Sequence, residues 1–144
     1  MDDDGRITVR TRIRAPLARV WDAYVTPEDI TKWNFASDDW HCPSARVDLR
    51  VGGTFSSRME SKDGKAGFDF TGRYLDVRRH SRIEYEMEDG RGVTVEFRPR
   101  TDSTEVEVAF DPDGVYSRER QAEGWGAILE NFRKHVDGSR AAKS

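Results

Sequence analysis

Residues 117–136 read SRERQAEGWGAILENFRKHV, and this stretch decides the fold. Apolar residues recur along it at the spacing of one helix face, namely Trp125, Ile128, Leu129, Phe132 and Val136. A helix of roughly 20 residues is about 30 Å long, enough to cover one face of a β-sheet. The tail from residue 137 to 144 is small and polar, so we expect the helix to end near Val136 and the tail to fray.

Upstream of this helix, residues 45–110 alternate between apolar and polar side chains in six successive runs. Such alternation is typical of β-strands with one buried face. Short turns separate the runs, among them Gly52-Gly53 and residues 62–65, and connections this short require antiparallel neighbours. The alternation changes phase around Gly72, where we expect a β-bulge.

The N-terminal part adds one strand and two helices. Residues 6–14 alternate, with Ile7, Val9, Thr11 and Ile13 on one face. A helical stripe follows from Leu17 to Val25, and Thr26-Pro27 begins a second, short helix whose apolar face is Ile30 and Trp33. Residues 34–44 have no regular pattern, and we interpret them as a lid loop.

Together these segments predict one α+β domain over residues 1–144, with an ordered core from about residue 6 to residue 136. The expected order is strand, two helices, six further strands and the long helix. A curved antiparallel sheet of about seven strands would then pack around the C-terminal helix.

Charge and composition narrow the classes of partner. The net charge is −3, which gives no reason to expect nucleic acid or an anionic membrane surface. No apolar run approaches the length of a bilayer-spanning helix, and residues 1–5 lack the apolar stretch of a signal peptide. The single cysteine, Cys42, cannot form an internal disulfide. We expect a cytoplasmic protein, either a monomer or a weak homodimer.

The outer face of the first strand carries a basic row, which includes Arg10 and Arg12. The last strand of the meander presents Glu105 and Glu107. If the two strands are neighbours, these rows meet as cross-strand pairs. A charge-paired, solvated face is therefore the preferred interpretation over a nucleic-acid site.

Five sequence pieces carry a resemblance to a known family. They are Ala15-Pro16 through Val20-Trp21-Asp22-Ala23, Pro27-Glu28 leading to Trp33, residues 48–55 (DLRVGGTF), residues 70–75 (FTGRYL), and Glu123-Gly124-Trp125 leading to Leu129. In this order they resemble the activator of heat-shock-protein-90 ATPase homologue family, within the START-like and polyketide-cyclase-like helix-grip superfamily. Residues 33–43 are similar to a bacterial branch of the family.

The resemblance implies a cavity between the sheet and the long helix. Relatives in the superfamily bind lipids, steroids, polyketides or plant hormones there, and a few catalyse aldol-type cyclisations. The eukaryotic activators of the family carry a further chaperone-binding domain ahead of this one, whereas this sequence begins at the first strand. We therefore expect a small hydrophobic ligand first, a chaperone partner second, and a cyclase-like enzyme using His41, Tyr74 or Tyr85 third.

The candidate site is an aromatic set, although aromatic residues also simply fill protein cores. Each glycine inside a helix costs about 1 kcal/mol relative to alanine, so Gly124 and Gly126 around Trp125 indicate that bulk is unwelcome there. A tight helix–sheet contact or a kink is the other interpretation. Ser57, Tyr74, Tyr85 and Tyr116 can supply polar groups. The predicted ligand-binding residues are Trp33, Phe35, Trp40, Phe55, Ser57, Met59, Phe68, Phe70, Tyr85, Gly124, Trp125 and Leu129.

No catalytic or metal-binding motif stands out. Asp38, Asp39, His41 and Cys42 match no zinc spacing, and one cysteine with one histidine leaves such a site short of ligands. No nucleophile–base set, phosphate loop or dinucleotide fingerprint occurs at an informative spacing. We predict no catalytic residue, no metal and no cofactor.

Overall fold

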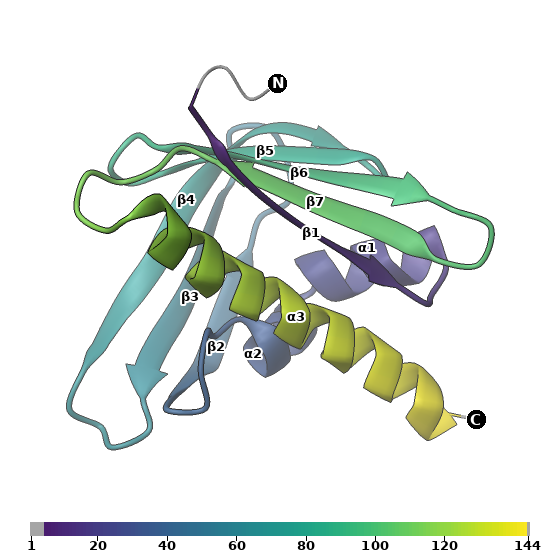
Figure 1. Ribbon diagram of the computed structural model, residues 1–144, viewed down its shortest axis with the longest axis horizontal. Helices are drawn as coiled ribbons and strands as arrows, with labels where there is room; N and C mark the ends of the chain where they lie inside the picture. Colours follow the sequence, from purple (N-terminus) through teal and green to yellow (C-terminus); the bar gives the residue numbers. More distant parts are fainter. Residues whose placement is uncertain (1–4, 144) are drawn as a thin grey trace.

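The computed structural model describes the backbone of residues 5–143 and the side chains of residues 5–137. Seven strands form one antiparallel sheet in the order β1-β7-β6-β5-β4-β3-β2, and three helices complete the fold (Figure 1). The elements are β1 (Ile7–Ile13), α1 (Leu17–Val25), α2 (Pro27–Trp33), β2 (Trp40–Val47), β3 (Thr54–Ser61), β4 (Gly67–Arg78), β5 (Arg82–Met87), β6 (Gly92–Pro99), β7 (Thr104–Phe110) and α3 (Arg118–Lys143). The predicted α+β helix-grip architecture is confirmed.

The long helix α3 lies across the concave side of the sheet, with α1 and α2 beside its C-terminal half (Figure 1). It packs against β1, α2 and α1. Strands β3 and β4 run away from β6 and β7, so the sheet opens on the side where α3 begins (Figure 1). Within the described residues, none of the helices combines the length and the apolar character needed to cross a membrane.

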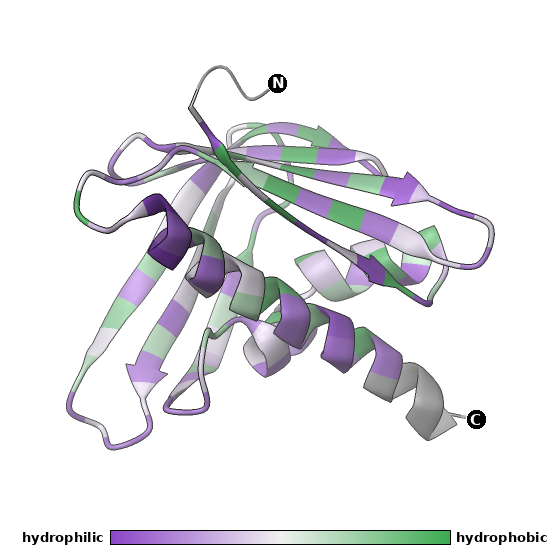
Figure 2. Cartoon of the chain, in the orientation of Figure 1, coloured by the Kyte–Doolittle hydropathy of each residue, from purple (hydrophilic) through white to green (hydrophobic). Residues whose placement is uncertain are grey.

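The core lies between α3 and the strands β1, β6 and β7, which we call the packed half of the sheet. Apolar and polar residues alternate along these strands (Figure 2), and Val95, Val106 and Phe110 are fully buried. Phe132 and Val136 cover them from α3 and are themselves fully buried. Helix α1 adds Trp21, whose ring centroid lies 5.1 Å from that of Phe97. The period-two pattern thus fixes which face each strand buries.

On the outer face, arginine and glutamate side chains pair across strands as predicted. Arg10 of β1 lies opposite Glu107 of β7, with Nη2 and Oε2 2.7 Å apart. Arg98 of β6 contacts the other oxygen of Glu107 at 3.0 Å, and Arg100 contacts Glu105. Exposed pairs of this kind contribute about 1 kcal/mol or less each, so they set solubility and register more than stability.

Helix α3 begins at a side-chain cap and ends later than predicted. The Ser117 hydroxyl accepts a hydrogen bond from the Arg120 N–H at 3.1 Å. At the other end the helix continues to Lys143, so the predicted end at Val136 is wrong. Arg133 pairs with Glu130 in the turn before it and with Asp137 in the turn after it, which stabilises helix across that point. The side chains of the predicted frayed tail, from residue 138, lie outside the described residues.

About half of the predicted lid loop, residues 34–44, belongs to a strand. Residues from Trp40 onward belong to β2, the edge strand beside β3, so only residues 34–39 form the loop. The register shifts between His41 and Ser44, which leaves Cys42 and Pro43 in a bulge. Proline has no N–H for a β-ladder, and an edge strand or a bulge tolerates it. The irregular composition of this segment therefore hid a real strand.

The predicted bulge at Gly72 and the predicted hairpin turn at Gly52-Gly53 also need correction. The bulge in β4 lies between Tyr74 and Asp76, whereas Gly72 keeps a regular register opposite Phe55 and Met87. Gly52-Gly53 does not close a two-residue hairpin, because the connection between β2 and β3 spans residues 48–53. Gly52 instead donates a hydrogen bond to the Tyr74 carbonyl at 2.8 Å and has a φ of 85°.

Candidate ligand-binding cavity

A cavity of about 300 Å³ lies between α3 and the strands β2, β3 and β4, which we call the open half of the sheet, with β5 between the two halves. Side chains from α1, α2, every strand from β2 to β5, β7 and α3 line it, and most of them are apolar. The predicted site residues that line it are Trp33, Phe55, Ser57, Met59, Phe68, Phe70, Tyr85, Trp125 and Leu129.

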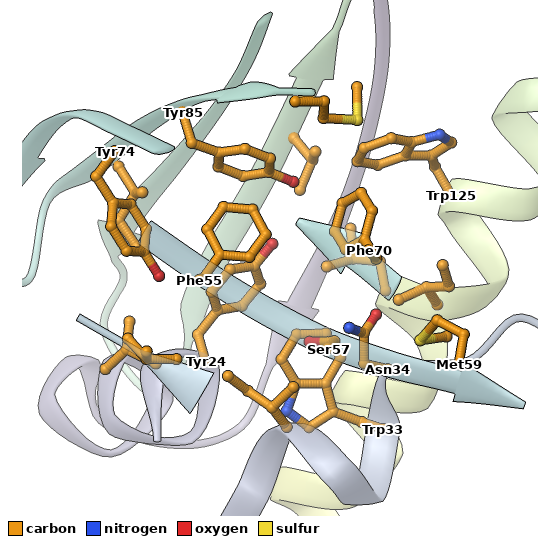
Figure 3. Close-up of a pocket in the computed structure, with 18 of the residues that line it drawn as sticks. Tyr24, Trp33, Asn34, Phe55, Ser57, Met59, Phe70, Tyr74, Tyr85 and Trp125 are labelled. Atoms are coloured by element: carbon orange, nitrogen blue, oxygen red, sulfur yellow. The ribbon is translucent and has the colours of Figure 1, made fainter. Parts of the chain in front are cut away.

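Phe55 lies at the centre of the aromatic wall (Figure 3). Its ring centroid is 5.6 Å from Phe70, 5.3 Å from Tyr74 and 4.8 Å from Tyr85. Gly72 makes this position possible, because a Cβ there would lie 2.5 Å from Phe55 Cζ and 2.8 Å from the Glu86 carbonyl oxygen. Gly72 is thus a strand position without a side chain that the Phe55 ring covers, and the phase change expected there comes from the bulge between Tyr74 and Asp76.

Three tyrosines gather at the inner end of the cavity, away from Phe68, which is half exposed at its outer end. Tyr74 and Tyr85 are direct partners across β4 and β5 and are 6% and 7% exposed. Tyr24 reaches the same space from α1 (Figure 3). Sequence reasoning assigned Tyr24 only to the apolar stripe of its helix. No local signal marks it as a cavity residue.

Burial keeps these phenols neutral. It raises the pKa of Tyr24 and Tyr85 far above the ordinary value, and the nearby tyrosines raise both further. The pKa of Tyr74 is also raised, first by burial and then by the negative charge of Asp48. At neutral pH each hydroxyl therefore keeps its proton and can both donate and accept a hydrogen bond.

Other polar groups lie along the cavity. Ser57 is buried beside Cys42. The Cys42 thiol donates a hydrogen bond to the Ser44 carbonyl at 3.4 Å, and burial raises its pKa. Asn34 presents its amide from the end of α2 (Figure 3). Arg91 is the one charged residue among the described lining residues, and two carboxylates hold it: Asp89 at 2.7 Å and Asp113 at 3.9 Å.

Three predicted site residues do not line the cavity: Phe35, Trp40 and Gly124. The Phe35 carbonyl accepts a hydrogen bond from Asn131 Nδ2 at 2.6 Å, which fastens the loop after α2 to α3. The Trp40 ring packs against Phe68, with centroids 5.9 Å apart. A Cβ on Gly124 would meet no atom within 4 Å.

The interpretation that bulk is unwelcome around Trp125 is therefore wrong. A Cβ on Gly126 would make only an ordinary contact with Val9, at 3.9 Å. Trp125 itself stacks on Phe110, with ring centroids 4.2 Å apart and an interplanar angle of 12°. It closes the cavity by lying flat on β7 rather than by filling a thinned part of the helix.

Of the three residues considered for catalysis, Tyr74 and Tyr85 line the cavity and His41 does not. His41 faces Glu60 across β2 and β3, with Nε2 and Oε1 3.8 Å apart, and it does not line the cavity. Tyr116 is half exposed in the loop before α3. Among the residues that the structure describes, no group of three histidine, cysteine or acidic side chains is placed to hold a metal ion.

A curved antiparallel sheet, a long C-terminal helix across it and a cavity between them define a helix-grip-like α+β domain. The family model described as "Activator of Hsp90 ATPase homolog 1-like protein" matches residues 14–137, and the chain belongs to this family. A search of the curated proteins found no match.

Solved structures agree with this assignment. The chain is 40% identical to an AHSA1-like protein from Aeromonas hydrophila, with 93% of each chain covered and a TM-score of 0.89. It is 39% identical to a protein from Cytophaga hutchinsonii, with 95% of each chain covered and a TM-score of 0.81. A protein from Nitrosomonas europaea, 21% identical over 98% of this chain and 99% of its own, has the same fold with a TM-score of 0.82.

Proposed function

We propose that the chain is a cytoplasmic protein, a monomer or weak homodimer, that binds a small hydrophobic ligand such as a lipid, polyketide or aromatic compound. The observation that carries the proposal is the cavity of about 300 Å³ with its mostly apolar lining. This volume falls at the lower end of the roughly 300–1,000 Å³ typical of ligand pockets. It equals the share of about ten water molecules in the liquid, at roughly 30 Å³ each.

The side chains around the cavity support a binding role over a filled core. Phe55, Phe70 and Trp125 are only partly buried, although each packs against the core. Equivalent positions of the packed half, such as Val95 and Val106, are fully buried. Large apolar groups that remain accessible inside a concave site gain contacts when an apolar molecule enters.

An NMR titration with biphenyl, an uncharged apolar probe, tests this proposal. We expect saturable amide shifts in β3, β4 and the Trp125 region of α3. Phe70→Trp adds bulk at the cavity wall and should weaken binding at least tenfold. Phe35→Trp is the matched control, because Phe35 does not line the cavity. An absence of saturable shifts, or shifts confined to the outer face of the sheet, would overturn the proposal.

The family description favours one second candidate, a chaperone cofactor that acts through its surface. The two candidates respond differently to the same variant. Phe70→Trp changes an internal wall, so a surface-acting cofactor would still alter a cognate chaperone's ATPase rate by the wild-type amount. A change of that rate by wild-type protein and by Phe70→Trp alike, together with no biphenyl binding, would favour the chaperone function.

A further inference from the structure

Three tyrosines lie at the inner end of the cavity. Tyr24, Tyr74 and Tyr85 come from three different elements, α1, β4 and β5, and converge around Phe55 (Figure 3). Their hydroxyls point into the cavity rather than toward the sheet or the helix backbone (Figure 3). The Phe55 ring, 5.3 Å from Tyr74 and 4.8 Å from Tyr85, holds the two strand tyrosines in place. Tyr24 is held by Trp33 and Phe132, with centroids 5.0 and 5.1 Å away.

These hydroxyls have no hydrogen-bond partner among the residues that the structure describes. Buried tyrosine hydroxyls normally find one, since a polar group removed from water without a partner is unfavourable. Within the described residues, only Ser103 Oγ and Asp137 Oδ1 are both sealed from solvent and without a partner. The tyrosine hydroxyls are therefore open to the cavity, where a molecule inside can reach them.

The charges around the cavity restrict what that molecule can be. Arg91 is the one cation among the described lining residues, and Asp89 and Asp113 already neutralise it. Asp48, whose negative charge contributes to the raised pKa of Tyr74, lies outside the cavity lining and is paired with Arg50 at 2.9 Å. Among the described lining residues, the inner end therefore offers an anion no free cation. An anionic group taken into this end would lose its hydration without gaining a countercharge, which is strongly unfavourable.

Resting on the proposed ligand-binding function, we propose that Tyr24, Tyr74 and Tyr85 form a subsite for an uncharged oxygen of the ligand. The ligand class is then a neutral, apolar molecule with a carbonyl or hydroxyl at one end. A carboxylate of the same shape, such as a fatty or aryl acid, is discriminated against. The raised pKa of the phenols agrees with this, because each stays a neutral donor over the physiological range.

A matched series of three probes tests the subsite: biphenyl, 4-acetylbiphenyl and biphenyl-4-carboxylate, titrated at neutral pH by calorimetry or NMR. We expect the ketone to bind more tightly than biphenyl and the carboxylate to bind more weakly. Tyr74→Phe and Tyr85→Phe remove only a hydroxyl, and each should weaken ketone binding about 2- to 10-fold. Biphenyl binding should not change in either variant. Tyr116→Phe is the control, because Tyr116 is exposed and outside the cavity.

The outcomes separate the two proposals. If none of the three probes binds, ligand binding in this cavity fails and the subsite fails with it. If biphenyl binds but the ketone gains nothing, or the Tyr→Phe variants bind it as well as wild type, the subsite is overturned and the cavity function stands. Preferential binding of the carboxylate would also overturn the subsite, and Arg91→Gln would then identify the group that recognises it.

Discussion

The strands of the packed half and of the open half have the same alternating sequence pattern, but their apolar side chains are buried to different extents. In the packed half, Val95, Val106 and Phe110 are completely buried beneath α3. In the open half, Phe55 and Phe70 are partly buried and Phe68 is 51% exposed. Both halves carry apolar residues on the concave face. The pattern therefore fixes the orientation of each side chain, whereas the path of α3 decides whether that side chain becomes core or cavity wall.

The two halves also differ in how their apolar side chains pack. The buried apolar residues of β6 and β7 are four valines together with Phe97 and Phe110, and α1 packs against β6. Phenylalanines and a bare glycine occupy β3 and β4, where the wall is built from rings that lean on one another. A wall of this kind keeps its shape without a helix against it, because each ring gains its contacts from neighbours within the sheet.

The largest difference between the halves should appear in stability. Phe132→Ala removes a fully buried ring that contacts Tyr24 and Trp33, so it should cost about 3–5 kcal/mol of unfolding free energy. Phe68→Ala, in the open half, should cost about 1 kcal/mol or less. Urea denaturation of the two variants measures both values. Equal losses would show that the cavity wall is part of the core.

Alkaline pH should destabilise the protein through the three buried tyrosines at the inner end of the cavity. The folded-state pKa values of Tyr24, Tyr74 and Tyr85 are raised above the unfolded value of about 10. Their contribution is complete below pH of about 10 and is lost as the pH rises toward the folded pKa, because the unfolded chain releases protons first. Each tyrosine then removes about 1.4 kcal/mol per pH unit.

Urea midpoints across this pH range, together with phenolate absorbance, measure the effect. Tyr85→Phe should flatten the pH dependence, because it removes one of the three buried phenols. Ionisation of all the tyrosines near the ordinary value, with the fold intact, would mean that the inner end of the cavity is open to bulk water.

The last comparison concerns two glycine-to-alanine substitutions, which should change the stability of the protein in opposite directions. Gly124→Ala should stabilise the protein by about 1 kcal/mol, because a Cβ there meets no atom within 4 Å and alanine favours helix. Gly72→Ala should destabilise it, because its Cβ would lie 2.5 Å from Phe55 Cζ. Thermal melts of both variants provide the comparison. A loss of stability in Gly124→Ala would restore the interpretation that bulk is unwelcome beside Trp125.

The sequence alone was sufficient for the fold because the strands have regular patterns. Ile83, Tyr85 and Met87 alternate with glutamates, and the structure buries all three. The pairing of the first and last strands was expected from the family resemblance, and the charge rows on those strands then predicted contacts such as Arg10–Glu107. Segments without a pattern were assigned less well. The β2 strand begins at Trp40 inside the predicted loop, because Pro43 and the bulge interrupt its alternation.

The cavity was harder to predict than the fold, since it depends on packing between distant elements. Trp40 and Phe35 look like cavity residues by composition, but Trp40 packs against Phe68 and neither of the two lines the cavity. Tyr24 looks like one more apolar residue of an amphipathic helix, yet it supplies a hydroxyl at the inner end. Residue type therefore predicts a mostly apolar cavity, and only the three-dimensional arrangement shows that three tyrosines lie at one end of it.

The bulge at Cys42 and Pro43 has a further consequence for how the molecule behaves at high concentration. Strand β2 ends one side of the sheet, and the free side of such a strand is a template to which another extended chain can add. Pro43 offers no N–H, and the register shift between His41 and Ser44 bends the row of hydrogen-bonding groups. Cys42 and Pro43, which interrupt the alternating pattern of β2, should therefore also disfavour edge-to-edge aggregation at this strand.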